Sequence, residues 1–222
     1  MKGAIVVFPG SNCERDTHRA LGSVGAKSIF VWHKETHIES PDFIIIPGGF
    51  SYGDYLRAGA IAKASPVMVE IRRHAKRGVS ILGICNGFQI LLEAGLLPGA
   101  MQRNATLHFI CKQQYLISTM RTASGKKLLR IPVAHGEGNY WTDGQSMEVL
   151  KDNEQIIFRY CDEEGVCTEA VNPNGSRFNI AGICSKERNV IGMMPHPERA
   201  CDDALGSVDG REIFLSFLNK EV

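Results

Sequence analysis

The segment 80–89, with the sequence SILGICNGFQ, constrains the fold of this chain more than any other. A short apolar run ends at Ile84, Cys85 follows, and an amphipathic helical pattern begins at once. Gly83 and Gly87 flank the cysteine in the pattern G-x-C-x-G, which has the form of the G-x-S-x-G nucleophile elbow with sulfur in place of oxygen. A sharp strand-to-helix turn crowds both flanking positions, so side chains there would clash. The segment therefore predicts a buried strand that lifts Cys85 above a sheet.

Short apolar runs and helical patterns alternate along much of the chain. The apolar runs are β-branched and continuous, as in strands that are buried on both faces of a parallel sheet. The candidate strands are residues 4–8, 28–32, 43–46 and 79–84, and the candidate helices are residues 14–24, 66–77, 86–97 and 209–219. This alternation predicts an α/β fold with an open, mostly parallel sheet that is flanked by helices.

The middle of the chain has a different pattern. Residues 106–118 and 155–160 have the character of antiparallel or edge strands, and so do residues 180–184 and 190–194, which a short polar stretch joins. We therefore expect additional antiparallel strands beside the parallel ones. No repeat, low-complexity tract or linker interrupts the sequence, which predicts a single domain over residues 1–222.

Charge and hydropathy exclude several classes of function. The 25 basic and 24 acidic residues leave a formal net charge of +1, so no basic field exists to hold nucleic acid or a membrane surface. No apolar run approaches the ~20 residues of a membrane span. The apolar start breaks at Pro9-Gly10, too early for a signal peptide. We expect a cytoplasmic protein that acts on small molecules or protein partners.

Two of the seven cysteines, Cys85 and Cys13, are candidate nucleophiles. No C-x-x-C pair occurs, so neither a zinc knuckle nor a thioredoxin-like site is supported. At the elbow, the start of the helix favours a thiolate on Cys85, and the Asn86 N–H points to where an oxyanion would form. The alternative is a structural cysteine in a tight turn. Cys13 also follows a strand, but it lacks paired glycines, and the adjacent Glu14 disfavours a thiolate.

A base is predicted far downstream, in the segment MPHPER. Met194 and His196 each precede a proline, which favours an extended backbone. In an extended chain, residues i and i+2 face the same side, so His196 and Glu198 share a face. Glu198 could then orient the imidazole, as the acidic member of a catalytic triad does. The alternative is a rigid surface turn.

The elbow combined with a distant His-x-Glu resembles the class I, triad-type glutamine amidotransferases. Over the whole chain the resemblance narrows to the glutaminase subunits of phosphoribosylformylglycinamidine synthase, which belong to purine biosynthesis. The matching segments are residues 8–13, 47–59, 83–89, 135–138, 172–176 and 193–199. The elbow and His-x-Glu indicate the class, whereas segments 47–59 and 172–176 indicate the narrower group.

The resemblance implies a role for each catalytic residue. Cys85 would be the nucleophile, His196 the acid and base, and Glu198 its partner. The N–H groups of Gly49 and Asn86 would form the oxyanion hole. Cys85 would attack the side-chain amide of glutamine, ammonia would leave, and water would release glutamate from the thioester.

Substrate-binding residues follow from the same resemblance. Gln89 and the backbone of His135, Gly136 and Glu137 would hold the α-amino and α-carboxylate groups of glutamine. For Gln89 the alternative is a polar helix residue that is satisfied within the protein. The glycines near His135 indicate a close-approach loop, so we expect a backbone contribution from His135 and no action as a base.

The resemblance places ATP chemistry on another chain. No metal or cofactor is expected here, and Ser124-Gly125-Lys126-Lys127 lacks the upstream glycine and the Ser/Thr of a P-loop. ATP and magnesium would belong to a large synthase subunit, which a small accessory subunit would accompany. Residues 50–57 are the candidate segment for sensing that partner, with a solvated loop as the alternative.

Two other functions remain open at the level of sequence. The first is a stand-alone cysteine hydrolase of the DJ-1/PfpI type. Such proteins commonly have His directly after the elbow Cys, where this chain has Asn86. The second is a non-catalytic binding module that keeps the fold, which the intact set of Cys85, His196 and Glu198 disfavours.

Overall fold

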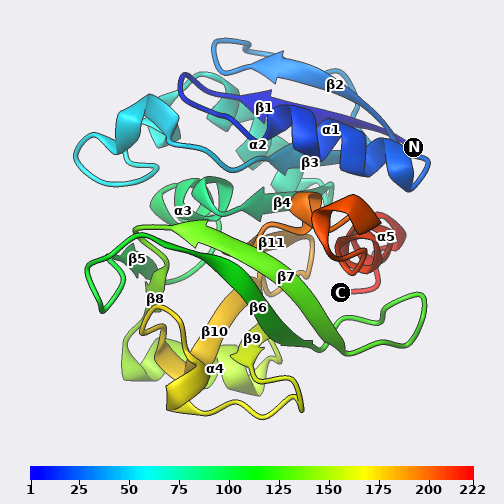
Figure 1. Cartoon of the computed structure of the whole chain (residues 1–222). Coiled ribbons are helices and arrows are strands. Elements are labelled where there is room, and N and C mark those ends of the chain that lie inside the picture. The colour runs from blue at the N-terminus through cyan, green and yellow to red at the C-terminus, as the bar shows by residue number, and fades with distance from the viewer.

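The computed structural model describes residues 1–222 and contains a nine-stranded mixed sheet in the order β2-β1-β3-β4-β11-β10-β9-β6-β7 (Figure 1). Its strands are β1 Lys2–Val7, β2 Lys27–Trp32, β3 Phe43–Ile46, β4 Ser80–Ile84, β6 Ile110–Ser118, β7 Leu128–His135, β9 Ile156–Cys161, β10 Ile180–Cys184 and β11 Val190–Met193. A separate pair is formed by β5 Ala100–Gln102 and β8 Asn139–Trp141. The α-helices are α1 Glu14–Ser23, α2 Val67–Lys76, α3 Asn86–Glu93, α4 Gly144–Asp152 and α5 Gly210–Asn219.

Five strands, β2, β1, β3, β4 and β11, run parallel to one another. Every residue of β3, β4 and β11 is buried, because helices cover both faces of this half. Helices α1 and α5 contact each other on one face, while α2 and α3 lie on the other (Figure 1). The predicted α/β class with a mostly parallel sheet is therefore confirmed.

The remaining strands extend the sheet in antiparallel fashion. β10 pairs with β11 through a short hairpin, and β9, β6 and β7 follow. β7 is absent from the sequence prediction, although its burial alternates with the period of two typical of a strand. Pro132 in its middle argues against a strand, but β7 is the last strand of the sheet, where a missing N–H is tolerated.

Helix boundaries agree with the sequence except at α3. This helix ends at Glu93, where residues up to 97 were expected, because Gly95 adopts a φ of +67° and the chain turns back. α4 is a helix that the sequence analysis did not predict, and Asp143 caps it by accepting a hydrogen bond from the Ser146 N–H at 2.8 Å. None of the helices has the length and apolar character that crossing a bilayer demands.

The parallel half brings four loops to one edge of the sheet. β1, β3, β4 and β11 are adjacent and parallel, so the segments after their carboxyl ends lie side by side. These segments contain Cys13, the pair Gly48-Gly49, Cys85 and His196. In open α/β sheets, ligands bind at this edge.

Close packing between β11 and α3 yields a test of the fold. A Cβ added at Gly192 would lie 2.0 Å from the Phe88 ring, so we expect Gly192→Ala to lower the free energy of unfolding by about 1–3 kcal/mol. Gly22→Ala in α1 is the matched control, because its Cβ would meet nothing within 4 Å and alanine favours a helix. Urea denaturation measures both, and equal stability of the two variants would contradict the packing.

Candidate active site

Cys85 occupies a strained elbow between β4 and α3. Its φ of 51° and ψ of −104° are unusual for a residue with a side chain, and such strain costs about 1–3 kcal/mol. A Cβ at Gly87 would lie 1.9 Å from the Ile46 carbonyl oxygen, and one at Gly83 would lie 2.5 Å from Leu91. The flanking glycines thus let α3 pack directly on the sheet, and this packing holds Cys85 in its turn.

The N-terminus of α3 surrounds Cys85 with backbone donors. Cys85 is the N-cap residue, and the N–H groups of the first turn, including that of Asn86, have no carbonyl partner within the helix. They favour negative charge near the sulfur. The Asn86 side chain has another task, since its Oδ1 accepts a hydrogen bond from the Ser51 N–H at 3.0 Å. Asn86 therefore ties the loop after β3 to the elbow.

His196 and Glu198 form a buried pair. The His196 Nδ1 lies 2.6 Å from the Glu198 Oε1, and each residue is only 2% exposed. The expected extended segment is wrong, because Pro197–Arg199 forms a single 3-10 turn directly after His196. This turn brings residues i and i+2 into contact, whereas in an extended chain they would only share a face.

The charge state of His196 follows from its neighbours. Burial disfavours a charged ring, but Glu198 and Cys85 outweigh it and hold the pKa of His196 well above its usual value. Since Nδ1 faces Glu198, Nε2 is the ring nitrogen that remains free. This buried Nε2 has no hydrogen-bond partner in the protein.

Gly48 and Gly49 bring the backbone after β3 against this pair. A Cβ at Gly48 would lie 2.7 Å from the His196 ring. Gly49 has a φ of +148°, and its Cβ would lie 2.7 Å from the Ser11 Cα, so only glycine fits. The Gly49 N–H donates to no group of the protein. Gly49 therefore offers a free donor next to Cys85 in the cavity that both line.

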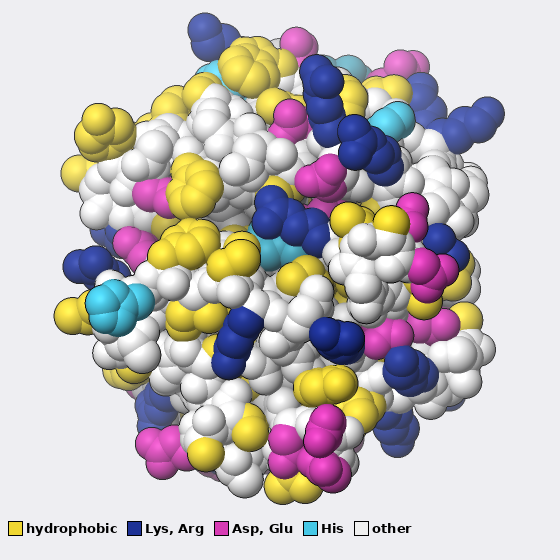
Figure 2. Space-filling view, viewed as in Figure 1, with side chains coloured by type: hydrophobic (Ala, Val, Ile, Leu, Met, Phe, Trp, Pro, Cys, Tyr) yellow, Lys and Arg dark blue, Asp and Glu magenta, His cyan; other side chains and the backbone are white.

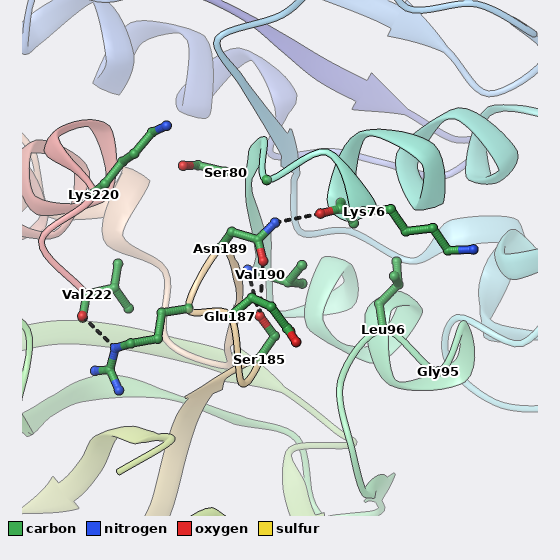
Figure 3. A pocket seen from close by; sticks show the side chains of 13 residues that line it. Lys76, Ser80, Gly95, Leu96, Ser185, Glu187, Asn189, Val190, Lys220 and Val222 are labelled. Atoms are coloured by element: carbon green, nitrogen blue, oxygen red, sulfur yellow. Dashed lines mark hydrogen bonds between the residues drawn. The ribbon is translucent and has the colours of Figure 1, made fainter. Parts of the chain in front are cut away.

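A cavity of about 260 Å³ opens at Cys85. It is lined by Gly49, Phe50, Asp54, Cys85, Gln89, Arg103, Leu107, Phe109, Ala134, His135, Gly136 and Glu137. The structure thus gathers all of the predicted substrate-binding residues in one cavity with Cys85. A wider hollow of about 660 Å³ lies at the opposite end of β4, where Ser80 and Asn189 line it, and it contains no predicted site residue (Figure 3).

Gln89 and His135 are held by contacts within the protein. Gln89 Nε2 donates to the Glu137 carbonyl at 2.6 Å, and its Oε1 accepts from Asn86 Nδ2 at 2.9 Å. His135 is the last residue of β7, and its buried ring contacts Asn104 Oδ1 at 3.0 Å. Burial and the nearby His196 lower the pKa of His135 to about 4. The ring is therefore neutral at neutral pH, and it is a weaker base than an ordinary histidine.

A second segment supports the backbone after β7. Asn174 Nδ2 donates to the Gly138 carbonyl at 2.7 Å, and the Ser176 hydroxyl donates to the same oxygen at 3.0 Å. Residues 172–176 carry part of the resemblance to the glutaminase subunits, and the structure assigns them this supporting contact. They hold one wall of the cavity in place.

Cys13 and Arg199 lie against the His196 pair, which the sequence analysis did not predict. The Cys13 Sγ is 4.0 Å from His196 Nδ1 and accepts a hydrogen bond from Arg199 Nη2 at 3.1 Å. Burial raises the pKa of the Cys13 thiol, which disfavours it as a nucleophile. Cys13, His196 and Glu198 offer the donor types that zinc binds, with atoms within 4.8 Å of one another, but the Arg199 cation opposes a metal there. The position of Cys13 after β1, beside β3, is the signal that could have indicated it.

Comparisons with known proteins agree with this geometry. The CobB/CobQ-like glutamine amidotransferase domain matches residues 1–212. A phosphoribosylformylglycinamidine synthase subunit PurQ from Moorella thermoacetica is 54% identical, with 99% of this chain and 96% of the relative covered. A protein of the same name from Synechocystis is 50% identical, with 96% and 98% covered.

Comparison with solved structures supports the fold. The structure of PurLQS from Thermotoga maritima matches with a TM-score of 0.83 and 39% identity, covering 98% of this chain and 97% of that one. A protein from Thermoplasma acidophilum that is named for GMP synthase shares the fold at a TM-score of 0.63 and 16% identity, covering 99% and 93%. The chain therefore belongs to the glutamine amidotransferase family, in its group of PurQ subunits of phosphoribosylformylglycinamidine synthase.

Proposed function

We propose that this protein is the glutaminase subunit of a phosphoribosylformylglycinamidine synthase. It hydrolyses glutamine to glutamate and passes the ammonia to an ATP-dependent partner that converts formylglycinamide ribonucleotide to formylglycinamidine ribonucleotide. The observation that carries this proposal is the strained Cys85 elbow, which opens into a cavity and has the buried His196–Glu198 pair beside it. Full-length similarity to PurQ subunits supports the identity of the acceptor reaction.

The geometry accounts for each chemical step. The Cys85 sulfur attacks the side-chain amide carbon of glutamine, and the N–H groups of Gly49 and Asn86 stabilise the oxyanion that forms. His196, held protonated by its neighbours, gives its proton to the departing ammonia. The neutral ring then takes a proton from water, which attacks the thioester and releases glutamate. No step uses a metal or cofactor, and we assign ATP and magnesium to the partner.

Neither alternative function is favoured. In a cysteine hydrolase of the DJ-1/PfpI type, the residue after the nucleophile would take part in acid–base chemistry, but here Asn86 holds the loop after β3 through Ser51. A non-catalytic module has no need of a strained cysteine beside a charged imidazole. Full-length relatives named as synthase subunits also support the glutaminase.

An apolar rim at the mouth of the cavity supports a protein partner. The rim consists of Phe50, Leu107 and Phe109, which line the cavity, together with Tyr55 and Leu56 in the loop after Phe50. The most exposed are Leu56 at 89% and Tyr55 at 74%. Figure 2 shows hydrophobic side chains gathered on the left of this face, over the loops beside α3. Apolar patches of this kind mark sites of protein interaction. We assign the rim to the large synthase subunit, with the small accessory subunit completing the assembly.

Replacing the nucleophile separates the two half-reactions. We expect Cys85→Ala to abolish glutamine hydrolysis, while the assembled synthase still makes product from added ammonia. Cys111→Ala, at an exposed position of β6, is the matched control and should retain full activity. Glutamate release and ammonia-dependent synthesis are both measured, and near-normal glutamine hydrolysis by Cys85→Ala would remove this residue from the mechanism.

Replacing the acidic partner tests the charge on His196. Glu198 raises the pKa of His196, so in Glu198→Gln the imidazolium loses its proton at lower pH. We expect the alkaline limb of the kcat–pH profile to move to lower pH and turnover to fall ~10²–10⁴-fold, the usual contribution of acid–base catalysis. Circular dichroism checks that the variant is folded. An unchanged profile and turnover would exclude Glu198 from the reaction.

Partner binding should switch on the glutaminase. Ammonia that is released into water is protonated and lost, so hydrolysis is useful only when the acceptor is in place. The loop 50–57 is strained, with positive φ at Tyr52, Gly53, Asp54 and Leu56, and it directly follows Gly49. A shift of Gly49 that removes one oxyanion donor costs ~10²–10³ in rate.

The measurement is steady-state glutamate release by the isolated glutaminase and by its complex with the synthase, in the presence of nucleotide and acceptor. We expect a rise of ~10²-fold or more in the complex, in line with the gain of one oxyanion donor. Leu56→Ser should weaken this activation, while the control Leu205→Ser, exposed in the segment that precedes α5, should not. Equal rates in the two states would contradict gating but leave the triad unaffected.

A further inference from the structure

The cavity beyond Cys85 carries charges of both signs. The acidic and basic side chains among its lining residues, histidine aside, are those of Asp54, Arg103 and Glu137. They come from three separate segments: the loop after β3, the connection between β5 and β6, and the loop after β7. The rest of the lining is apolar, backbone, or the neutral Gln89 and His135. A small cavity that is lined by Cys85 and by side chains of both charges fits a zwitterion.

Asp54 and Glu137 form an acidic wall without a cation. Neither carboxylate has a Lys or Arg within ion-pair distance. The sole hydrogen-bond partner of the Asp54 carboxylate is Asn86 Nδ2, at a long 3.3 Å. Burial, and then the negative charge of Glu137, raise the pKa of Asp54 to about 6. An ammonium group that entered the cavity would relieve this repulsion.

Arg103 carries the positive charge that would complement a carboxylate on the ligand. Arg103 lines the same cavity, and its guanidinium forms neither an ion pair nor a hydrogen bond within the protein. A guanidinium presents a planar set of donors that matches a carboxylate in bidentate fashion. The unpaired Arg103 is therefore available to a ligand carboxylate.

The elbow alone cannot select glutamine. The thiol of Cys85 and the backbone donors of Gly49 and Asn86 act on any primary amide, so selection depends on the other end of the substrate. That end of glutamine carries an ammonium and a carboxylate on one carbon atom. Gln89, which the resemblance assigns to this end, already has both ends of its side-chain amide bonded within the protein.

We propose that Asp54 and Arg103 determine the specificity for glutamine by binding its charged α-carbon end: Asp54, with Glu137, takes the α-ammonium, and Arg103 takes the α-carboxylate. The proposal rests on the glutaminase function proposed above. It gives Gln89 the role of holding the Glu137 backbone in place. Discrimination between glutamine and other amides then depends on Asp54 and Arg103, with Glu137 assisting Asp54.

Two amides that each lack one charge test the assignment. 4-Carbamoylbutanoate is glutamine without the α-ammonium, and 4-aminobutanamide is glutamine without the α-carboxylate. Their inhibition constants are measured as competitors of glutamine hydrolysis by the assembled synthase, together with KM and kcat for glutamine. The variants are Asp54→Asn and Arg103→Gln. The controls are Glu163→Gln and Arg130→Gln, at exposed positions whose side chains make no hydrogen bond.

For Asp54→Asn we expect KM for glutamine to rise ~10–100-fold, the usual effect of losing a hydrogen bond to a charged group. The inhibition constant of 4-carbamoylbutanoate should stay within about twofold of wild type, because this amide has no ammonium to lose. Arg103→Gln should show the converse, with a raised KM for glutamine and an unchanged inhibition constant for 4-aminobutanamide. Both controls should match wild type.

The outcomes separate the two proposals. If the wild-type complex releases no glutamate from glutamine, the proposed function fails. If it does, but each variant weakens glutamine and its matched analogue equally, or lowers kcat alone, then Asp54 and Arg103 only support the fold and the inference is overturned. The rate at which iodoacetamide alkylates Cys85 shows whether each variant is folded around the elbow. A variant with a wild-type rate and an unchanged KM also overturns the inference.

Discussion

The contact between the start of α3 and the end of β3 is the constraint on which the site depends. Gly87 lies so close to the Ile46 carbonyl that a single methyl group would collide with it. This contact lets the helix begin directly after β4 and forces Cys85 into a backbone conformation that side chains rarely adopt. The strain places the sulfur at the helix N-terminus, beside free backbone donors and over the edge of the sheet. Strained residues of this kind cluster at active sites.

The order of the parallel strands then brings the other residues of the site close to Cys85. Because β1, β3, β4 and β11 are neighbours, the loops that follow them meet at Cys85 without any long excursion of the chain. His196 lies in the segment that follows β11, and Gly49 lies in the segment that follows β3. The antiparallel half contributes differently, since β7 ends at His135 and turns its backbone toward the cavity. One half of the sheet thus positions the candidate catalytic residues, and the other builds a wall of the cavity.

Burial and neighbouring charges together set the pKa values of His196 and Asp54 at this edge of the sheet. The His196–Glu198 pair is removed from water, which disfavours charge on the imidazole, yet Glu198 and Cys85 hold the pKa of His196 well above its usual value. Asp54 shows the opposite balance, because burial and Glu137 both disfavour its charge. The site therefore combines a histidine of raised pKa beside Cys85 with acidic side chains in the cavity that lack a cation partner. Both features suit a substrate that needs a proton at its leaving group and carries an ammonium at its other end.

Sequence alone determined the elements whose signal is local. Continuous apolar runs predicted β1 to β4, and the G-x-C-x-G spacing predicted the elbow, because both patterns arise from neighbouring residues and their contact with one sheet. Sequence also pointed to His196 and Glu198, but it assigned them an extended segment where the structure has a 3-10 turn. It missed β7, whose Pro132 is acceptable only because the strand lies at the sheet edge.

Tertiary structure alone decided which residues meet. Cys13 and Arg199 are 186 positions apart in sequence and touch beside His196, while Asp54, Arg103 and Glu137 converge on one cavity from three loops. Such contacts depend on strand order and on the distances between loops, which no local pattern encodes. The elbow that presents Cys85 could therefore be predicted from the sequence, whereas the surroundings that raise the pKa of His196 and shape the cavity arise only when distant segments pack together.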